Sequence, residues 1–174
     1  MEQIKNLNKS FKGINSGREF TKNALVDLFS LEELANKIVI KEDEKLWYKN
    51  IKYCWVDWKR VGFYWLRKEK NIYYLLIFWT CNAKWWDFSE EESLLIAYKL
   101  NKLDDCKIPN LWKAILLRIV NEIKKSNNKA KELKFTATVY AINKWFYSNT
   151  LNLFENNWYI KDYSIIDRDY IVYL

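Results

Sequence analysis

The side chains that most enzymes use for chemistry are scarce in this chain of 174 residues. The chain contains no histidine, so it cannot build a Ser-His or Cys-His nucleophile pair, nor a histidine-ligated metal site. Its only glycines are Gly13, Gly17 and Gly62, which excludes both a P-loop and the glycine-rich turn of a dinucleotide-binding fold. Carboxylates and cysteines remain as candidates for catalysis.

Two carboxylate pairs are close in the sequence. Asp104 and Asp105 precede the turn at Pro109, and Asp167 and Asp169 mark the tip of a predicted hairpin. A pair of acids performs general acid–base catalysis only when its environment separates the two pKa values. Because Asp is common in turns for its own local hydrogen bonds, we assign both pairs to turn formation and predict no catalytic residue.

The three cysteines, Cys54, Cys81 and Cys106, are odd in number, far apart and in no C-x-x-C spacing. This pattern favours buried, reduced thiols over a disulfide framework or a zinc site. No apolar run reaches the roughly 18 to 20 residues that a membrane helix needs, and Met1-Glu2-Gln3 does not begin a signal peptide. We therefore predict a cytoplasmic protein without a membrane partner or a metal ion.

Positive charge is concentrated in one segment of the chain. Overall, 29 Lys and Arg face 22 Asp and Glu, and Lys107–Lys134 alone holds eight cations against two acids. A preceding acidic segment, Asp87–Asp105, holds six acids against two lysines, so the two runs could simply be solvated helix faces. The alternative is a cationic patch that meets phosphates or an acidic protein surface. Its candidate binding residues are Lys124, Lys125, Lys129, Lys131 and Lys134.

Aromatic residues are the second unusual feature, because ten Trp, twelve Tyr and nine Phe make up 18% of the chain. Between residues 47 and 68, Trp and Tyr alternate with cations that include Lys59 and Arg60. This arrangement suits single-stranded nucleic acid, since bases stack on exposed rings, but about half of the rings on a strand must point inward. Trp85 and Trp86 lie in a predicted loop, where both cannot easily be buried, so one is a candidate interface anchor.

The N-terminal half is predicted to hold two short helices followed by an antiparallel sheet. Each helix begins with an S-x-x-E capping box, at Ser16–Glu19 and Ser30–Glu33, and continues with apolar residues at helical spacing. From residue 46 the pattern changes to aromatic and β-branched runs with polar breaks between them. The predicted strands are Leu46–Trp58, Val61–Lys68 and Ile72–Cys81, separated at Lys59-Arg60 and Glu69-Lys70-Asn71.

The C-terminal half mixes helices and strands. A third capping box at Ser89–Glu92 favours a helix over residues 89–103, although part of that segment is also compatible with a buried strand. After Pro109, apolar residues follow i, i+3, i+4, i+7 spacing, which predicts a long amphipathic helix. We then expect a strand over Leu133–Ile142, a short helix around Asn149–Asn157 and a hairpin of Tyr159–Ile166 with Tyr170–Leu174. The result is a single α+β domain over residues 1–174, in which an antiparallel or mixed sheet packs against several helices.

Several of these C-terminal features occur together in a known family. The basic helix Ala114–Lys125 leads through a polar turn into a strand in which Phe135, Ala137 and Val139 would point inward. Asn149–Tyr159 is similar to a helix that ends in Leu-Tyr-Glu before a Gly-Phe pair, and a hairpin follows. With Val61-Gly62-Phe63 on an early strand, residues 55–174 resemble the GNAT superfamily of acyl-CoA N-acyltransferases. The resemblance implies a GNAT-like fold, acetyl-CoA as the cofactor, and cofactor binding at Asn110 and Lys113, with Lys113 in contact with phosphate.

The sequence departs from the family pattern where the chemistry should take place. Family members hold the CoA pyrophosphate on backbone N–H groups of a glycine-containing loop. Here Ile108–Lys113 contains no glycine, and Pro109 removes a donor. The tyrosine that often protonates the departing thiolate falls on Phe154, which has no proton to give. The fold can therefore be present without the reaction.

The leading prediction is a small, basic, aromatic-rich cytoplasmic binding protein that has no catalytic function and no cofactor. It would act as an inhibitor by occupying a nucleic-acid-binding or acidic surface of a protein or nucleoprotein partner, with RNA as one candidate ligand. An anti-CRISPR or other anti-defence protein of a phage or mobile element has this profile. Two alternatives remain: a divergent GNAT-like N-acyltransferase that uses acetyl-CoA, and an assembly protein whose Trp-rich surface forms a homo-oligomer interface.

Overall fold

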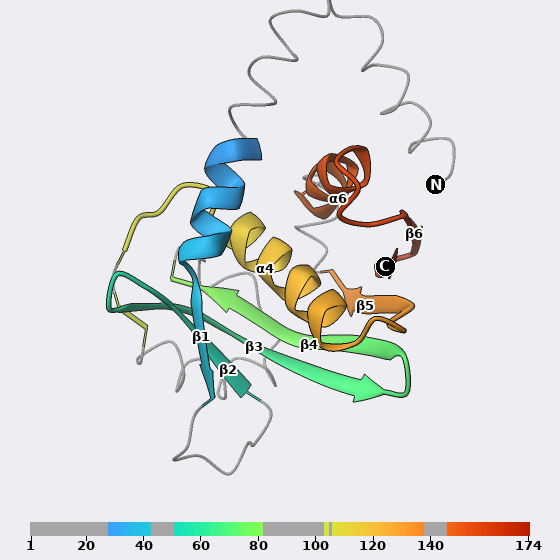
Figure 1. Ribbon diagram of the computed structural model, residues 1–174, viewed down its shortest axis with the longest axis horizontal. Coiled ribbons are helices and arrows are strands. Elements are labelled where there is room, and N and C mark those ends of the chain that lie inside the picture. Colours follow the sequence, from blue (N-terminus) through green and yellow to red (C-terminus); the bar gives the residue numbers. More distant parts are fainter. Residues whose placement is uncertain (1–27, 43–50, 82–102, 105, 138–145) are drawn as a thin grey trace, which may run out of the picture.

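A seven-stranded mixed sheet forms the centre of the described structure (Figure 1). The computed structural model describes residues 28–42, 51–81, 103–104, 106–137 and 146–174. Within them the strand order is β1-β2-β3-β4-β5-β7-β6, antiparallel at every junction except β4–β5. The strands are β1 (Val39–Glu42), β2 (Ile51–Val56), β3 (Lys59–Glu69), β4 (Ile72–Thr80), β5 (Glu132–Thr136), β6 (Asp162–Ile166) and β7 (Asp169–Tyr173). The predicted α+β class is confirmed, and the sheet is the mixed alternative.

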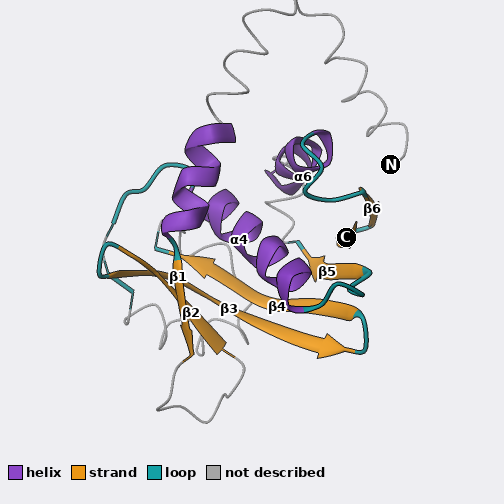
Figure 2. Ribbon diagram, in the orientation of Figure 1, coloured by secondary structure: helices purple, strands orange, loops and turns teal. Residues whose placement is uncertain are grey.

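In the described part of the chain, three helices accompany the sheet: helix 28–37, α4 (Leu111–Ser126) and α6 (Phe146–Asn156) (Figure 2). The predicted long helix is therefore confirmed as α4. Its buried residues recur at the expected spacing and are Leu111, Ala114, Ile115, Leu116, Leu117, Ile119, Val120 and Ile123. They share one core cluster with Leu31 and Ala35 of helix 28–37 and with Leu151 and Phe154 of α6. The three helices and the sheet thus enclose a common core.

The turn between β2 and β3 lies earlier than the sequence predicted. Val56 pairs with Lys59, so the turn is Asp57-Trp58, and both residues have left-handed backbone, with φ of 47° and 69°. Lys59 and Arg60 belong to β3, and the prediction of a polar break there was wrong. The error arose because such two-residue turns usually carry Gly at the second position, whereas this one carries Trp58 with 94% of its surface exposed.

The β3–β4 hairpin agrees with the prediction. β3 ends at Glu69, Lys70 takes a left-handed φ of 56°, and β4 begins at Ile72. The register shifts after Trp65, which pairs with Ile77 while Leu66 pairs with Leu75. Leu76 is therefore an extra residue of β4 at a β-bulge, and its side chain is exposed.

The parallel junction between β4 and β5 is short. Ile72, Tyr73 and Tyr74 pair with Glu132, Leu133 and Lys134, and no further pair is formed in the described residues. A parallel pair requires a crossover connection, and α4 provides it by running back across the sheet (Figure 1). The two ends of α4 therefore lie near opposite ends of the sheet.

The C-terminal elements follow the predicted order with shifted ends. β5 begins at Glu132, and Leu133 and Phe135 are buried in it. Of the expected inward set, Phe135 and Ala137, which follows the strand, are buried, and Val139 lies outside the described residues. α6 begins at Phe146, earlier than the predicted start near residue 149. The hairpin is confirmed, with its turn at Asp167-Arg168 and Asp169 already in β7.

Some predictions concern residues outside the described ranges. These are the first capping box, the helix or strand alternative over residues 89–103, and the pair Trp85-Trp86. The second capping box is a correction: helix 28–37 already includes Ser30, so Ser30 is not its N-cap. No helix of the described residues is long and apolar enough to span a membrane.

The prediction of three reduced cysteines was wrong for two of them, because Cys81 and Cys106 form a disulfide. Backbone hydrogen bonds bring these residues together: Cys81 N–H donates to the Val61 carbonyl at 2.8 Å, and Asp104 N–H donates to the Arg60 carbonyl at 2.8 Å. Both partners lie in β3, a proximity that sequence spacing does not reveal. Disulfides persist in oxidising environments, so the cysteines no longer support the predicted cytoplasmic location.

The close approach of β4 and α4 at Gly62 yields a first prediction. A Cβ atom at this position would lie 2.7 Å from the Trp79 carbonyl oxygen and 3.0 Å from Ile115 Cδ1. We expect Gly62→Ala to lower the free energy of unfolding by about 1–3 kcal/mol, measured by denaturant titration. Adding Ile115→Val should recover only part of the loss, because the shorter contact is with backbone. Full recovery would contradict this account of Gly62.

The disulfide yields a second prediction, a count of reactive thiols at pH 8. Cys54 is free and buried, and burial raises the pKa of its thiol to about 12. We expect no reactive thiol in the native protein, one after denaturation, and three after denaturation with reductant. In Cys54→Ala the count in denaturant alone should fall to zero, whereas two thiols in that sample would show that Cys81 and Cys106 are not bonded.

Candidate functional site

Four exposed lysines gather where α4 ends and β5 begins. Lys124 and Lys125 occupy the last turn of α4, where cations stabilise the negative end of the helix dipole. Lys129 and Lys131 lie beyond the helix, in the connection to β5, so the helix dipole does not account for their positive charge. These four residues are named here the basic turn, and all of them were predicted as binding residues from the charge of the segment.

The backbone of the basic turn is held in place by the sheet and by Asn127. The Asn127 side chain accepts a hydrogen bond from Lys129 N–H at 3.1 Å and donates one to the Tyr73 hydroxyl at 3.3 Å. Lys131 N–H donates to the Asn71 carbonyl at 2.8 Å, and the Lys131 carbonyl accepts from Leu174 N–H at 2.9 Å. The lysines are thus presented from a fixed platform rather than from a free loop.

The acids nearest to the basic turn in the sequence are already paired with other cations. Glu122 forms an ion pair with Arg118 at 3.0 Å, and Glu132 forms one with Lys134 at 3.1 Å. The hydrogen bond to Glu132 raises the pKa of Lys134, which is half-buried on β5. Lys134 was a predicted binding residue, but its ammonium group is engaged here. In the described residues, none of the four lysines of the basic turn forms an ion pair.

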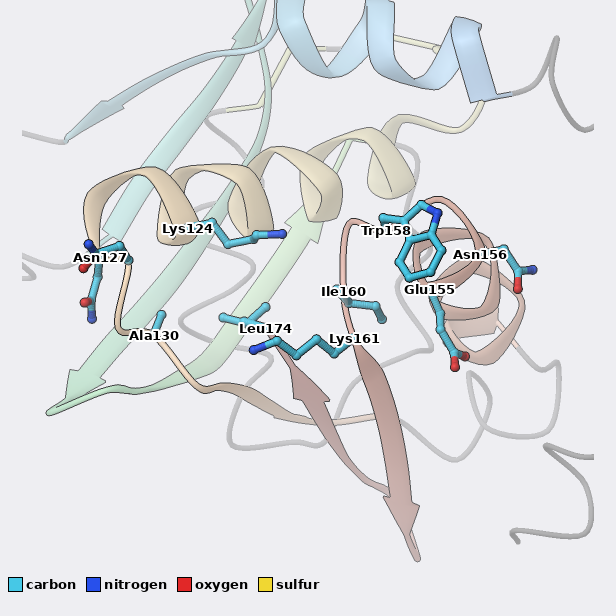
Figure 3. Close-up of a pocket in the computed structure, with 10 residues that line it drawn as sticks. Lys124, Asn127, Ala130, Glu155, Asn156, Trp158, Ile160, Lys161 and Leu174 are labelled. Carbon is cyan, nitrogen blue, oxygen red and sulfur yellow. The ribbon is translucent and has the colours of Figure 1, made fainter.

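A cleft of about 790 Å³ opens beside the basic turn (Figure 3). Lys124 reaches it from α4, and Trp158 and Lys161 reach it from the loop between α6 and β6. The cleft is also lined by the apolar side chains of Ala130, Ile160 and Leu174, by the amides of Asn127, Asn128 and Asn156, and by Glu155. It combines cations, amides and one large ring in a single hollow, and is named here the Trp158 cleft.

The end of α6 fixes the backbone that carries Trp158. Tyr159 N–H donates to the Phe154 carbonyl at 3.0 Å, and Trp158 N–H donates to the Glu155 carbonyl at 3.2 Å. With the ring contact of Phe154 and Tyr159, whose centroids are 6.2 Å apart, these bonds form a Schellman motif. The residue after the helix in this motif is usually Gly because its backbone is left-handed, and here it is Trp158 with φ of 65°.

Trp158 therefore occupies a position that disfavours it. A left-handed backbone costs a residue with a side chain about 1–2 kcal/mol. The indole recovers little of that cost through burial, since 89% of the residue surface is exposed. Lys161 and Trp158 were not predicted as site residues. The available signal was the large aromatic residue directly after Asn156-Asn157, where a helix end calls for a small one.

The predicted aromatic and cationic surface at Lys59 and Arg60 has a different arrangement from the one expected. The Arg60 guanidinium lies 4.7 Å from the ring centroid of Tyr53 and 4.8 Å from that of Trp55. The Lys41 ammonium also lies 5.3 Å from the Trp55 ring. Trp55 is thus already in contact with two cations of the chain, so a base could stack on it only after displacing one of them.

The predicted cofactor residues lie at the opposite end of α4. Asn110 is the exposed N-cap residue with a left-handed φ of 58°, and its side chain makes no capping hydrogen bond. Lys113 is half-buried, with its ammonium 5.8 Å from the Trp112 ring. Since α4 has 16 residues, the helix separates Asn110 from the basic turn by about 20 Å. The two predicted sites are distinct.

The acids singled out in the sequence serve the backbone and the turns. Asp104 accepts a hydrogen bond from Arg60 N–H at 2.6 Å, and Asp169 accepts one from the Thr136 hydroxyl at 2.5 Å. Asp167 occupies the β6–β7 turn with φ of 55°, and Asp105 is outside the described residues. Among the residues that the structure describes, no group of three or more possible ligands could hold a metal ion.

No protein-family model matches the sequence, and no curated protein is similar to it. The function must therefore be inferred from the residues and their geometry.

Proposed function

We propose that this protein is a non-catalytic binding protein that holds the phosphates of a nucleic acid on the basic turn. The observation that carries the proposal is the set of four exposed lysines on an anchored backbone, with the neighbouring acids Glu122 and Glu132 paired elsewhere. An inhibitor that occupies the nucleic acid of a nucleoprotein partner would act through the same lysines. The predicted cytoplasmic location is part of this proposal because RNA is abundant there, and the disulfide between Cys81 and Cys106 counts against that location.

Counterion release explains why such a surface binds a phosphate backbone. Each phosphate that a lysine neutralises releases condensed counterions, so the affinity falls as the salt concentration rises. A platform whose backbone is fixed loses less conformational entropy on binding than a free loop. An acidic protein surface has fixed charges but no condensed counterion layer of this density. The salt dependence therefore separates the two kinds of ligand.

A GNAT-like N-acyltransferase is the second candidate, and the order of the elements favours it. The elements from β4 onward follow the order that the resemblance implies: α4, the parallel strand β5, α6 and the β6–β7 hairpin. Val61-Gly62-Phe63 lies on β3. Against acyl transfer, Phe154 is buried and has no hydroxyl group, and Pro109 precedes α4.

The basic turn is tested by removing its charge. We expect Lys125→Gln, Lys129→Gln and Lys131→Gln together to weaken binding of a labelled mixed-sequence RNA, single-stranded or duplex. The slope of log affinity against log salt should become shallower by about 2, at about 0.7 per lost phosphate contact on a single strand. Fluorescence anisotropy at several salt concentrations measures both quantities.

A matched control removes the same charge elsewhere. Lys41, Lys59 and Lys107 are exposed and lie outside the basic turn, and Lys59 belongs to the other surface predicted from the sequence. Their triple Gln variant should keep the wild-type salt slope. If this control loses more affinity than the basic-turn variant, the binding surface includes these lysines instead of the basic turn, and the proposal is wrong.

The enzyme candidate is tested by a thermal melt with acetyl-CoA. A ligand at 100 times its Kd adds about 2.7 kcal/mol, which raises Tm by roughly 5–10 °C at about 2–4 °C per kcal/mol. For a non-catalytic binding protein we expect any shift at millimolar acetyl-CoA to be the same in the wild type and in Lys113→Ala. A shift of that size that is reduced in Lys113→Ala would place CoA at the start of α4 and favour the acyltransferase.

A further inference from the structure

The Trp158 cleft has the composition of a site for one nucleotide. Its volume of about 790 Å³ lies within the range of small-molecule sites. Lys124 Nζ donates to the Tyr159 carbonyl at 2.9 Å, which holds the ammonium group next to the loop that carries Trp158. An ammonium has three donors, so this bond leaves two for a phosphate. Lys161 supplies a second cation from another element (Figure 3).

Trp158 supplies a platform that the fold itself does not require. Its left-handed backbone would suit Gly better, and its side chain is almost fully exposed. Residues held in a disfavoured conformation persist where the rest of the structure enforces them, and they concentrate at functional sites. The Schellman motif of α6 enforces this conformation, and Trp158 lines the cleft from that fixed backbone.

We propose that the Trp158 cleft binds one unpaired nucleotide of a single-stranded nucleic acid, with its base stacked on Trp158 and its phosphates held by Lys124 and Lys161. This inference rests on the proposed function and specifies its ligand, because the neighbouring strand would continue onto the basic turn. A base inside a duplex is already stacked on both faces and cannot use Trp158. Stacking on a ring accepts any base, so recognition is by strandedness rather than by sequence.

The hairpin residue Trp58 offers a matched control. It too has a left-handed backbone and is almost fully exposed, with φ of 69°. It lies at one end of β3, whereas the basic turn is tied to Asn71 beyond the other end of that strand. The 11 residues of β3 separate the two places by about 35 Å. Replacing either Trp by Gly makes the same chemical change in the same kind of backbone.

The experiment compares wild type, Trp158→Gly, Trp158→Phe and Trp58→Gly by anisotropy with labelled 12-nucleotide RNA. The probes are a single strand, a duplex and an abasic single strand of equal charge. We expect Trp158→Gly to bind the single strand about 10-fold more weakly or worse, and to bind the duplex and the abasic strand like wild type. Trp158→Phe should retain most of the affinity, and Trp58→Gly should retain all of it.

Thermal melts of the same variants exclude unfolding as the cause of lost binding. Both Gly variants should raise Tm by a few degrees, because Gly relieves the left-handed backbone. A more stable protein that has lost only single-strand affinity supports the proposal. Single-strand binding by Trp158→Gly at wild-type affinity would overturn it, as would an equal loss on all three probes.

The two proposals fail in different ways. If the basic-turn variant loses RNA affinity while Trp158→Gly binds every probe like wild type, the basic turn binds phosphates and the Trp158 cleft takes no base. If the wild type binds none of the three RNA probes at low salt, both proposals are wrong.

Discussion

The parallel pairing of β4 and β5 is the constraint on which the rest of the structure depends. Because the chain must return to the starting end of the sheet before β5 can form, a long helix has to cross it, and α4 is buried along most of its length as a result. The same crossing separates the two ends of α4. Asn110 lies at one end, just after the segment that the disulfide at Cys106 links to β4. The lysines of the basic turn lie at the other end, before β5.

The elements that could be predicted are those whose hydrophobic period or charge can be read within one continuous stretch of the sequence. α4 shows its period over 16 residues, β5 shows a regular alternation over its five, and the charge of Lys124–Lys131 is visible in the sequence itself. The β2–β3 turn was misplaced because Trp58 stands where Gly would have marked it. The disulfide and Lys161 were missed for another reason: each depends on residues that become neighbours only through the order of the strands.

Local rules are broken at two exposed tryptophans, and the two cases differ in their surroundings. Trp58 caps a hairpin and borders solvent, whereas Trp158 borders a hollow that also contains two cations. Left-handed backbone also occurs at Asp57, Lys70, Asn110 and Asp167, so what distinguishes Trp158 is a large exposed ring at such a position beside a hollow. Glu122 and Glu132 are paired with Arg118 and Lys134, so neither neutralises a lysine of the basic turn, and Glu155 is the one acid among the described residues that line the cleft.

The bond between Cys81 and Cys106 also changes the covalent topology of the chain. The two cysteines are 25 positions apart in the sequence, so the bond closes the polypeptide between them into a ring. This ring runs from the end of β4 to Cys106, shortly before α4 begins. A protease that cuts once inside this ring would open it without releasing a fragment. The N-terminal strands and the C-terminal half would stay one molecule, joined by sulfur instead of by peptide.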